Sequence, residues 1–587
     1  MPDRVPLPVD PAERFGRLAR EIGIPGVAWG VVRDGVLAAS GGIGTTRDGE
    51  DRRPDADTVF RIASMTKSFT CATLLLLRDE GRLRLDDPVA AWVPALATWP
   101  LPTADSEPVT IRQLMTMSGG LPTDDPWGDR QQGLDLDRFA ELLAAGPSFA
   151  FPPATTFEYS NLGYGILGRV ITAAAGREYR ELVADRILRP LGMDATVYLE
   201  EQVPEARLAH GYVRQGDRLV REGRDGYGAL ASMGGLFSTV ADLARWVQGY
   251  IDAFPARDDP EGGHPLRRAT RRELQQGTRP IPLRILSAAP DQEPLVLAGS
   301  YGFGLAVRLD AELGTFVSHS GGYPGFGSHM VWHPATGLGV IALGNLRYAP
   351  MSPASNDVIG ALVRADAAPR RRLVALPAAI ANRRVVDGLI ERWDDAVADD
   401  VFAMNMDLDE PRELRRAAIA QVVAELGPFK PDDARGTDVE SPAQLSWWLR
   451  GTRGWARVGL LVTPEPRPRL QRLTVRGVGD PSPAIRSLAE RVLGMAARPP
   501  GAWPRDLPVT ADVDRDAVLR ALRVAAPRFG ILRLGLPTAG DGRTTTTFDL
   551  TAERGRAELT VGLDAGGKTV TAISLAVPER ESPPEAW

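Results

Sequence analysis

The chain has 587 residues, of which 25% are charged, and a net charge of −6 with both signs mixed along its length. This length predicts roughly two to four domains, and the lack of a basic patch argues against nucleic acid and anionic membranes as partners. A single cysteine, Cys71, excludes an intramolecular disulfide and argues against a cysteine-ligated metal site.

The N-terminal stretch MPDRVPLPVDPAERFGRLAREIG is polar and rich in proline, and it contains no apolar run of signal-peptide length. No later apolar run reaches the roughly 18 residues that a membrane span needs. We therefore expect a cytoplasmic protein, unless a leader has been removed.

The first 360 residues predict one α/β (α+β) sheet to which both ends of this region contribute strands. Residues 12–21 have an amphipathic helical pattern, and the β-rich runs GVAWGVV (26–32) and VLAASGGIG (36–44) follow around the turn RDG. From Ser64 to Gly81 the pattern is apolar on nearly every side, which predicts a buried helix. Strand patterns return between residues 301 and 345.

A stretch rich in charge, alanine and proline, VRADAAPRRR (363–372), predicts the end of this first domain, 1–365. Three segments beyond it recur after about one hundred residues. The pairs are NMDLDEPRELR (405–415) with TADVDRDAVLR (510–520), RGWARVGLLV (453–462) with RGRAELTVGL (554–563), and LTVRGV (473–478) with ISLAVP (573–578). We expect two small α+β repeat domains, 373–480 and 481–587, that shape a substrate entrance or form an oligomer interface.

The motif SMTK (64–67) places a serine three residues before a lysine. The chain has 69 lysines and arginines, and only Lys67, Lys430 and Lys568 are lysines. Unlike arginine, lysine can lose its proton when it is buried. Three residues apart on a helix, Ser64 and Lys67 share a face, so the amine can reach the hydroxyl, and the helix N-terminus favours an alkoxide there. The structural alternative is a capping serine and a solvated lysine.

Two further motifs follow in order, YSN (159–161) and HSGG (319–322). With these three motifs the chain resembles the serine β-lactamase and penicillin-binding protein superfamily, close to its branch of class C β-lactamases, esterases and D-aminopeptidases. The resemblance covers about residues 10–360. It implies a β-lactamase/transpeptidase-like fold, an antiparallel sheet with a helical subdomain, in agreement with the predicted sheet.

The resemblance also implies roles for the motif residues. Tyr159 would carry a second proton, its pKa lowered by the nearby lysine cation. Asn161 would hold Lys67 and the substrate. The Gly322 N–H would form the oxyanion hole with the Ser64 N–H, and Gly321 would clear space beside the substrate. No metal or cofactor is implied.

His319 departs from the β-lactamase pattern, because it stands where relatives hold a lysine. A mostly neutral histidine supplies no constant positive charge for a substrate carboxylate. This weighs against β-lactamase activity and favours esters or D-amino-acid amides and peptides. The alternative is that His319 simply packs within its strand.

The remaining features carry less information. We assign no role to the other histidines, His210, His264, His329 and His333. Met117 stands where many relatives carry a histidine, which we interpret as a packing difference. The absence of a GxSxG elbow argues against an α/β-hydrolase.

We therefore predict a serine hydrolase that cleaves ester or amide bonds through a Ser64 acyl-enzyme. Its substrates would be small esters, amides or peptides. Carboxylesterase and D-amino-acid amidase or peptidase rank level, with β-lactamase and D-Ala-D-Ala carboxypeptidase behind them. A non-catalytic acyl-binding or scaffold protein, with C-terminal repeats that bind a partner, is the alternative from another class.

Overall fold

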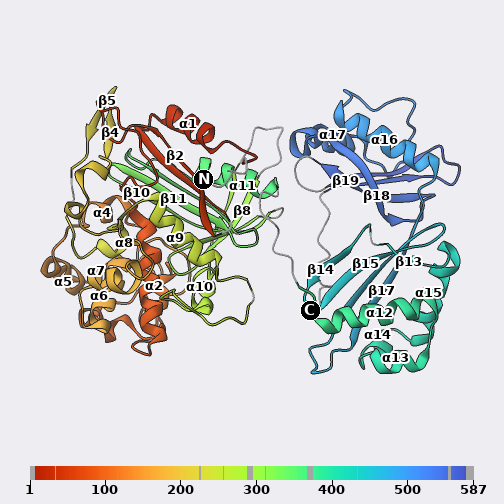
Figure 1. The fold of residues 1–587 in the computed structure, drawn as a ribbon, viewed down its shortest axis with the longest axis horizontal. Coiled ribbons are helices and arrows are strands. Elements are labelled where there is room, and N and C mark those ends of the chain that lie inside the picture. Colours follow the sequence, from red (N-terminus) through yellow and green to blue (C-terminus); the bar gives the residue numbers. More distant parts are fainter. Residues whose placement is uncertain are drawn as a thin grey trace. The chain divides into compact units, whose positions relative to one another are not determined.

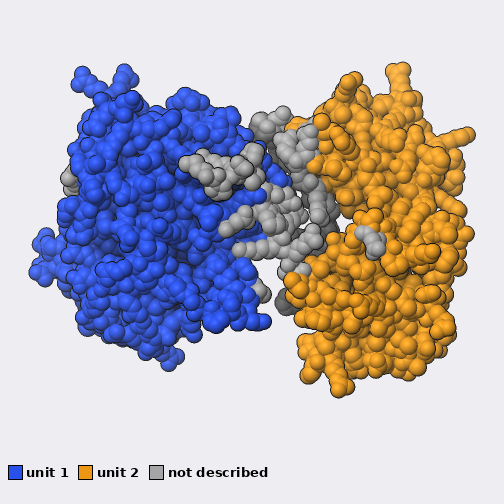
Figure 2. Space-filling view, viewed as in Figure 1, with its two compact units in different colours: residues 1–371 blue, residues 372–587 orange. Residues whose placement is uncertain are grey.

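The computed structural model describes residues 7–33, 35–223, 226–255, 257–286, 295–310, 313–365, 374–432, 434–552 and 557–576, with backbone alone at 284–286, 295–297, 526 and 528. The chain divides into two compact units, Met1–Arg371 and Arg372–Trp587, which Figure 2 distinguishes by colour. Most of the predicted boundary at 363–372 lies outside the described residues, and the predicted division of the second unit into two domains stays a prediction.

The first unit is built on an eight-stranded antiparallel sheet (Figure 1). In spatial order its strands are β2 (Val36–Gly44), β1 (Gly26–Arg33), β12 (Leu338–Gly344), β11 (Phe326–His333), β10 (Gly314–Tyr323), β9 (Ala306–Asp310), β8 (Leu295–Tyr301) and β7 (Arg279–Leu286). Strand β1 pairs with β12, so that Val27 lies opposite Gly344. The expected sheet, to which both ends of the region contribute, is therefore confirmed.

Helices cover both faces of this sheet. The predicted N-terminal helix is α1 (Pro11–Ile22), which packs with α11 (Ser352–Arg364) on one face through apolar side chains such as Phe15 and Leu362. Helix α9 (Val240–Ile251) packs on the other face against β1, β11 and β12. On that second side the largest apolar core of this unit connects the sheet to the helical subdomain.

The buried helix predicted from Ser64 is present, but it begins later. Helix α2 (Thr66–Asp79) follows a 3-10 turn over Ala63–Met65 that contains Ser64. The turn arises because Ala63 has a φ of +48°, which no α-helix accommodates. Helix α2 is buried from Thr66 to Leu77 and contacts α6 (Asn161–Ala175).

The predicted run of strand over 301–309 is interrupted between β8 and β9. Gly304 has a φ of +70°, and a Cβ placed on it would lie 2.5 Å from the backbone oxygen of Lys67. The break therefore lets the chain pass against the beginning of α2, where only a glycine fits.

Shorter elements complete the first unit. The helices are α3 (Ile111–Met115), α4 (Asp125–Asp129), α5 (Leu136–Ala145), α7 (Tyr179–Val183), α8 (Ala231–Gly234) and α10 (Arg268–Leu274). Two small sheets pair β3 (Phe60–Arg61) with β6 (Phe237–Ser238) and β4 (Tyr212–Gln215) with β5 (Arg218–Arg221).

The second unit contains two antiparallel sheets, each accompanied by its own helices. The first half comprises α12 (Pro377–Glu391), α13 (Asp395–Val401), α14 (Met406–Asp409), α15 (Arg412–Leu426), β13 (Lys430–Pro431), β14 (Thr437–Ser441), β15 (Gln444–Arg450), β16 (Gly454–Val462) and β17 (Leu470–Gly479). The second half comprises α16 (Pro483–Ala497), α17 (Arg515–Phe529), β18 (Leu532–Gly540), β19 (Thr545–Ala552), β20 (Ala557–Leu563) and β21 (Val570–Ala576).

The segments that resemble each other in sequence occupy corresponding elements in the two halves. The first pair lies where α15 and α17 begin, the second pair on β16 and β20, and the third on β17 and β21. Residues 554–556 and 577–578 of these segments lie outside the described residues. Each half has more than the predicted helix and three strands, since a second long helix, α12 or α16, and at least one further strand are present.

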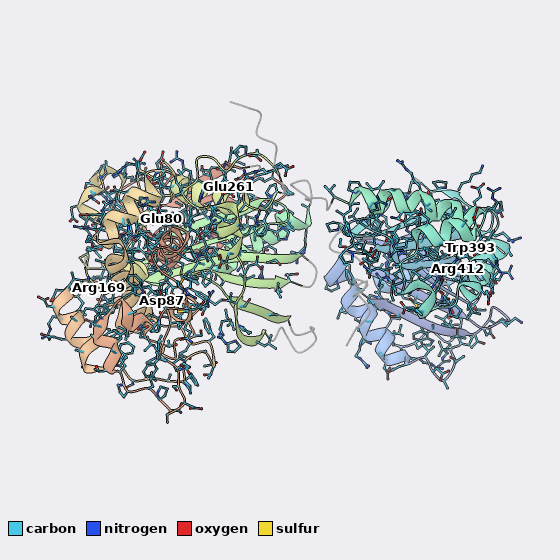
Figure 3. The ribbon with its side chains drawn as sticks, turned by 90° about the horizontal axis from the view of Figure 1, so that it is seen from below. Glu80, Asp87, Arg169, Glu261, Trp393 and Arg412 are labelled. Atoms are coloured by element: carbon cyan, nitrogen blue, oxygen red, sulfur yellow. The ribbon has the colours of Figure 1, made fainter. Side chains whose placement is uncertain are left out.

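The second unit contains two clusters in which arginine side chains pack against aromatic rings. In the first, Trp393 and Arg412, both labelled in Figure 3, each contact the ring of Phe402. In the second, the Arg435 guanidinium lies between the rings of Trp448 and Trp455, at 4.1 and 4.4 Å from their centres.

Arg435 also connects the two halves of the unit. Its Nη2 donates a hydrogen bond to the carbonyl oxygen of Pro537 on β18, at 2.9 Å. Burial lowers the pKa of its guanidinium to about 10. Arg435 is therefore enclosed by one half of the unit while it bonds to the other.

Candidate active site

Ser64 lies at a strained position of the backbone. The residue before it, Ala63, adopts the left-handed conformation that side chains other than glycine rarely take, and such strain costs about 1–3 kcal/mol. Ser64 itself is 8% exposed. The packed surroundings of the 3-10 turn thus hold the hydroxyl in one place.

Lys67 is fully buried and its amine touches the serine. Nζ lies 3.0 Å from Ser64 Oγ, 2.7 Å from Asn161 Oδ1 and 2.9 Å from the carbonyl oxygen of Met233. These three acceptors match the three hydrogens of an ammonium group. Burial lowers the pKa of Lys67 to about 8, so that a substantial share of the amine is neutral just above neutral pH.

Three aspartates of the stretch TDDPWGD act on this lysine, and the sequence-based reading missed all three. The negative charges of Asp125, Asp129 and Asp124 oppose the effect of burial on the Lys67 pKa. In the sequence they look like a solvated loop, and only their proximity to Lys67 in space gives them significance. Burial in turn raises the pKa of Asp129 to about 6.

Two of these aspartates set the position of Asn161. The Asp124 carboxylate accepts hydrogen bonds from the backbone N–H groups of Asn161 and Leu162, at 2.6 and 2.8 Å, at the beginning of α6. Asp125 Oδ1 accepts from Asn161 Nδ2 at 2.8 Å. Because Nδ2 is bound to Asp125, the Asn161 amide presents its oxygen to Lys67.

Tyr159 completes the cluster around the serine. Its hydroxyl is near enough to the Ser64 side chain to interact with it, and its ring centre lies 4.9 Å from Lys67 Nζ. The expectation that the lysine cation lowers the Tyr159 pKa is wrong, because burial and the charge of Asp125 raise that pKa well above its ordinary value. The phenol therefore keeps its proton and suits the role of a proton donor.

Strand β10 passes beside the serine turn. A Cβ on Gly321 would lie 2.2 Å from the Ile62 carbonyl oxygen, so only glycine allows this approach. Strand β9 pairs with β10 only as far as Ser318, which leaves residues 319–323 beyond its end. A Cβ on Gly322 would lie 2.8 Å from the ring of Tyr348.

His319 is buried on β10 with both ring nitrogens occupied. Nδ1 lies 2.6 Å from the Ser320 carbonyl oxygen and therefore carries the proton, and Nε2 accepts from the Tyr301 hydroxyl at 2.9 Å. Burial and the Lys67 charge lower its pKa to about 3. His319 is thus neutral at physiological pH, in line with the sequence-based argument.

The structure brings Ser64, Lys67, Tyr159 and Asn161 into one hydrogen-bonded or ring-contact cluster, with β10 beside the serine turn. Of the other histidines, His329 bonds to Ser320 of the HSGG motif, whereas His210 bonds to Glu205, His264 to Leu266 and His333 to Thr336. Met117 lies under the YSN motif, where its Sδ is 3.4 Å from the Ser160 backbone nitrogen. Among the described residues, no group of three or more histidine, cysteine or acidic side chains is placed to hold a metal ion.

The family described as Beta-lactamase matches residues 12–365, which is more than half of the chain. The chain belongs to the Beta-lactamase family. The match confirms the resemblance, and it covers the unit that carries the cluster around Ser64. No helix within the described part of this Beta-lactamase family chain is both long and apolar enough to cross a membrane. The cytoplasmic location stays a prediction.

This Beta-lactamase family chain is similar in sequence to two characterised bacterial proteins, among others. It is 33% identical over 233 residues to the D-alanyl-D-alanine-carboxypeptidase/endopeptidase AmpH of Escherichia coli (strain K12), covering 38% of the chain and 57% of AmpH. It is 28% identical over 321 residues to penicillin-binding protein 4* of Bacillus subtilis (strain 168), covering 50% of the chain and 64% of the relative. The chain thus spans less than two thirds of either relative.

One solved structure matches nearly the whole chain. The octameric penicillin-binding protein homologue from Pyrococcus abyssi is similar with a TM-score of 0.50 and 18% identity, over 94% of this chain and 96% of that one. This likeness concerns the fold alone. Together with the family match it confirms the predicted fold class, a β-lactamase/transpeptidase-like domain followed by further sheet-containing parts.

Proposed function

We propose that this chain is a serine hydrolase that cleaves ester or amide bonds through an acyl-enzyme on Ser64. The observation that carries the proposal is the 3.0 Å contact between Lys67 Nζ and Ser64 Oγ in a site where burial lowers the lysine pKa to about 8. A neutral amine at this distance can take the hydroxyl proton.

The first step is acylation. Ser64 Oγ attacks the substrate carbonyl carbon while its proton passes to Lys67, and the N–H groups of Ser64 and Gly322 stabilise the oxyanion. Tyr159 donates its proton to the leaving group as the carbonyl re-forms. The lysine cation then returns a proton to the phenolate, which leaves Lys67 neutral again.

The second step is hydrolysis of the ester that joins the acyl group to Ser64. A water molecule gives one proton to Lys67 and attacks the same carbonyl carbon. The bond to Ser64 Oγ then breaks, and the serine oxygen regains a proton from the lysine. The products are the free acid and the original enzyme.

The neutral state of His319 supports ester and amide substrates that carry no carboxylate beside this residue. A neutral imidazole with both nitrogens occupied offers no cation to such a group. We therefore rank carboxylesterase and D-amino-acid amidase or peptidase first. D-Ala-D-Ala carboxypeptidase is the second candidate, because the relative of 33% identity carries that name.

The test uses the full chain, a fluorophosphonate, a penicillin, p-nitrophenyl acetate, D-alanine amide and a peptide that ends in D-Ala-D-Ala. We expect one fluorophosphonate adduct by intact mass, and hydrolysis that Ser64→Ala lowers at least about 10³-fold. Lys67→Arg, which keeps the charge but cannot act as a base, should also abolish labelling.

The substrates separate the candidates. Release of D-alanine from the peptide, together with a penicillin adduct, would favour the carboxypeptidase. Turnover of the ester or the amide alone would favour the first-ranked activities. Hydrolysis that survives Ser64→Ala, or no adduct and no turnover, would overturn the proposal and favour the non-catalytic alternative.

A further inference from the structure

Tyr348 is held beside Gly322 in a strained conformation. It lies between β12 and α11 and has a φ of +50°, where a residue other than glycine costs about 1–3 kcal/mol. Its backbone N–H lies 3.3 and 3.2 Å from the carbonyl oxygens of Tyr323 and Phe326, which flank the turn between β10 and β11. These backbone contacts thus fix the position of the Tyr348 Cα, from which the side chain extends.

The ring of Tyr348 extends from β10 to the helical subdomain. One edge covers Gly322, whose missing side chain makes room for it. The hydroxyl donates to Asp129 Oδ2 at 2.8 Å, at the last residue of α4. Asp129 is only 3% exposed, whereas Tyr348 is 44% exposed.

A second connection joins the same two segments. Arg130, which follows Asp129, lies 3.6 Å from the Glu222 carboxylate. Glu222 also pairs with Arg347, the neighbour of Tyr348. The loop that carries Tyr348 and the end of α4 are therefore joined both directly and through Glu222.

The proposed chemistry indicates which part of the substrate lies beside the Tyr348 ring. The substrate carbonyl oxygen would lie at the Gly322 N–H, and the leaving group would point to Tyr159, its proton donor. The acyl group must then lie on the remaining side. Tyr348 is the exposed ring next to Gly322, where its hydroxyl bonds to Asp129. The Tyr159 ring instead contacts the ring of Tyr301.

We propose that Tyr348 contacts the acyl part of the substrate and limits its size, and that Asp129 positions the ring for this role. The inference rests on the proposed function and deepens it, since it predicts a preference for short acyl groups. Asp129 acts through the hydrogen bond that fixes the phenol and does not touch the substrate. No group is transferred by either residue.

The experiment measures kcat/KM of the full chain for p-nitrophenyl acetate, butyrate and octanoate. Tyr348→Gly removes the ring and suits the positive φ, so the fold should tolerate it better than alanine. We expect the octanoate-to-acetate ratio to rise at least about tenfold. Tyr348→Phe keeps the ring but loses the hydrogen bond to Asp129, so its ratio should rise to about that of Asp129→Ala. Leu309→Ala, an exposed truncation on β9, is the matched control and should leave the ratio unchanged.

Asp129 is tested by rescue. Asp129→Ala frees the phenol and should raise the ratio toward that of Tyr348→Gly. Asp129→Asn still accepts the hydrogen bond and should restore the original ratio. If both variants gave the same ratio as the unchanged chain, Asp129 would have no positioning role.

A leaving-group series completes the design, because phenyl, p-nitrophenyl and 4-methylumbelliferyl acetates vary only the other side of the carbonyl. Tyr348→Gly should leave their relative rates unchanged. An unchanged acyl ratio in a variant with the parental melting temperature, or an effect that follows the leaving group, would overturn the inference alone. Absence of Ser64-dependent hydrolysis in the unchanged chain would overturn the proposed function, and the inference with it.

Discussion

Two opposing effects set the protonation of Lys67. Burial favours the neutral amine, whereas the charges of Asp125, Asp129 and Asp124 favour the cation. Their balance leaves a pKa of about 8, close to the pH at which a general base works best. The lysine can therefore alternate between the two forms that the proposed reaction needs.

The pH dependence of the reaction should report this balance. Below about pH 8 Lys67 is increasingly protonated and cannot accept the Ser64 proton, so kcat/KM for p-nitrophenyl acetate should fall about tenfold per pH unit. Above that pH the rate should level off. His319 titrates only near pH 3 and should add no step around pH 6.5. A midpoint between about 6 and 6.5 would instead indicate that Asp129 or a histidine controls the rate.

Removing the charge of Asp125 should shift that profile. Asp125→Asn keeps an oxygen acceptor for Asn161 Nδ2 but loses a charge that stabilises the lysine cation. The Lys67 pKa should fall, and the midpoint of the rate profile should move to lower pH. Asp137→Asn, an exposed change on α5, should not move it. A midpoint that stays in place or rises in Asp125→Asn would contradict this electrostatic account.

At this scale the helical spacing of SMTK predicts the contact of Ser64 with Lys67, and the family resemblance implies the contact of Asn161 with Lys67. Their catalytic roles stay predictions. The sequence does not predict the sign of the Tyr159 pKa shift, which depends on burial and on Asp125. Nor does it single out Tyr348, a tyrosine in a loop that gains meaning only through Gly322 and Asp129.

Among the elements, the beginning of α2 shows how tertiary contacts override a local pattern. The apolar run after Ser64 predicts the helix, and α2 is buried from Thr66 to Leu77. The positive φ of Ala63 nevertheless delays the helix to Thr66. Alanine gives no sequence signal for that conformation, since glycine is the residue that usually adopts it.

In the second unit, Arg435 should contribute strongly to stability. Arg435→Ala removes the cation between two tryptophan rings and the hydrogen bond to Pro537. We expect the free energy of unfolding of this unit to fall by about 2–4 kcal/mol. Urea unfolding followed by tryptophan fluorescence measures it, with the exposed Arg416→Ala as control. Superimposable curves for the two variants would show that Arg435 does not hold the halves together.

For the whole molecule, periodicity predicts the sheet of the first unit because its strands are bounded by clear turns. The internal duplication of the second unit is likewise visible in sequence, as the similar segments fall on corresponding strands and helices. The number of elements in each half is less predictable. Helix α12 has no counterpart among the similar segments, and its place against α15 and β16 is a matter of packing.

The pairing of β1 with β12 has a consequence for biosynthesis. Gly26 donates its backbone hydrogen bond to Asn345 Oδ1, 319 residues away in the chain. Translation proceeds at roughly 5–20 residues per second, so the first strands wait many seconds for their neighbour. During that time their edge is open to other chains.

Nascent chains offer a direct measurement. Chains arrested on the ribosome with Asn345 still inside the tunnel should be cut by protease within residues 26–44. Chains arrested after β12 has emerged should resist in that segment. Equal protease resistance in the two sets of chains would mean that other residues protect the β1–β2 hairpin before β12 is made. Ser64 leaves the ribosome early and Gly322 late. A ribosome-bound chain should therefore not hydrolyse substrate until almost the entire first unit has been made.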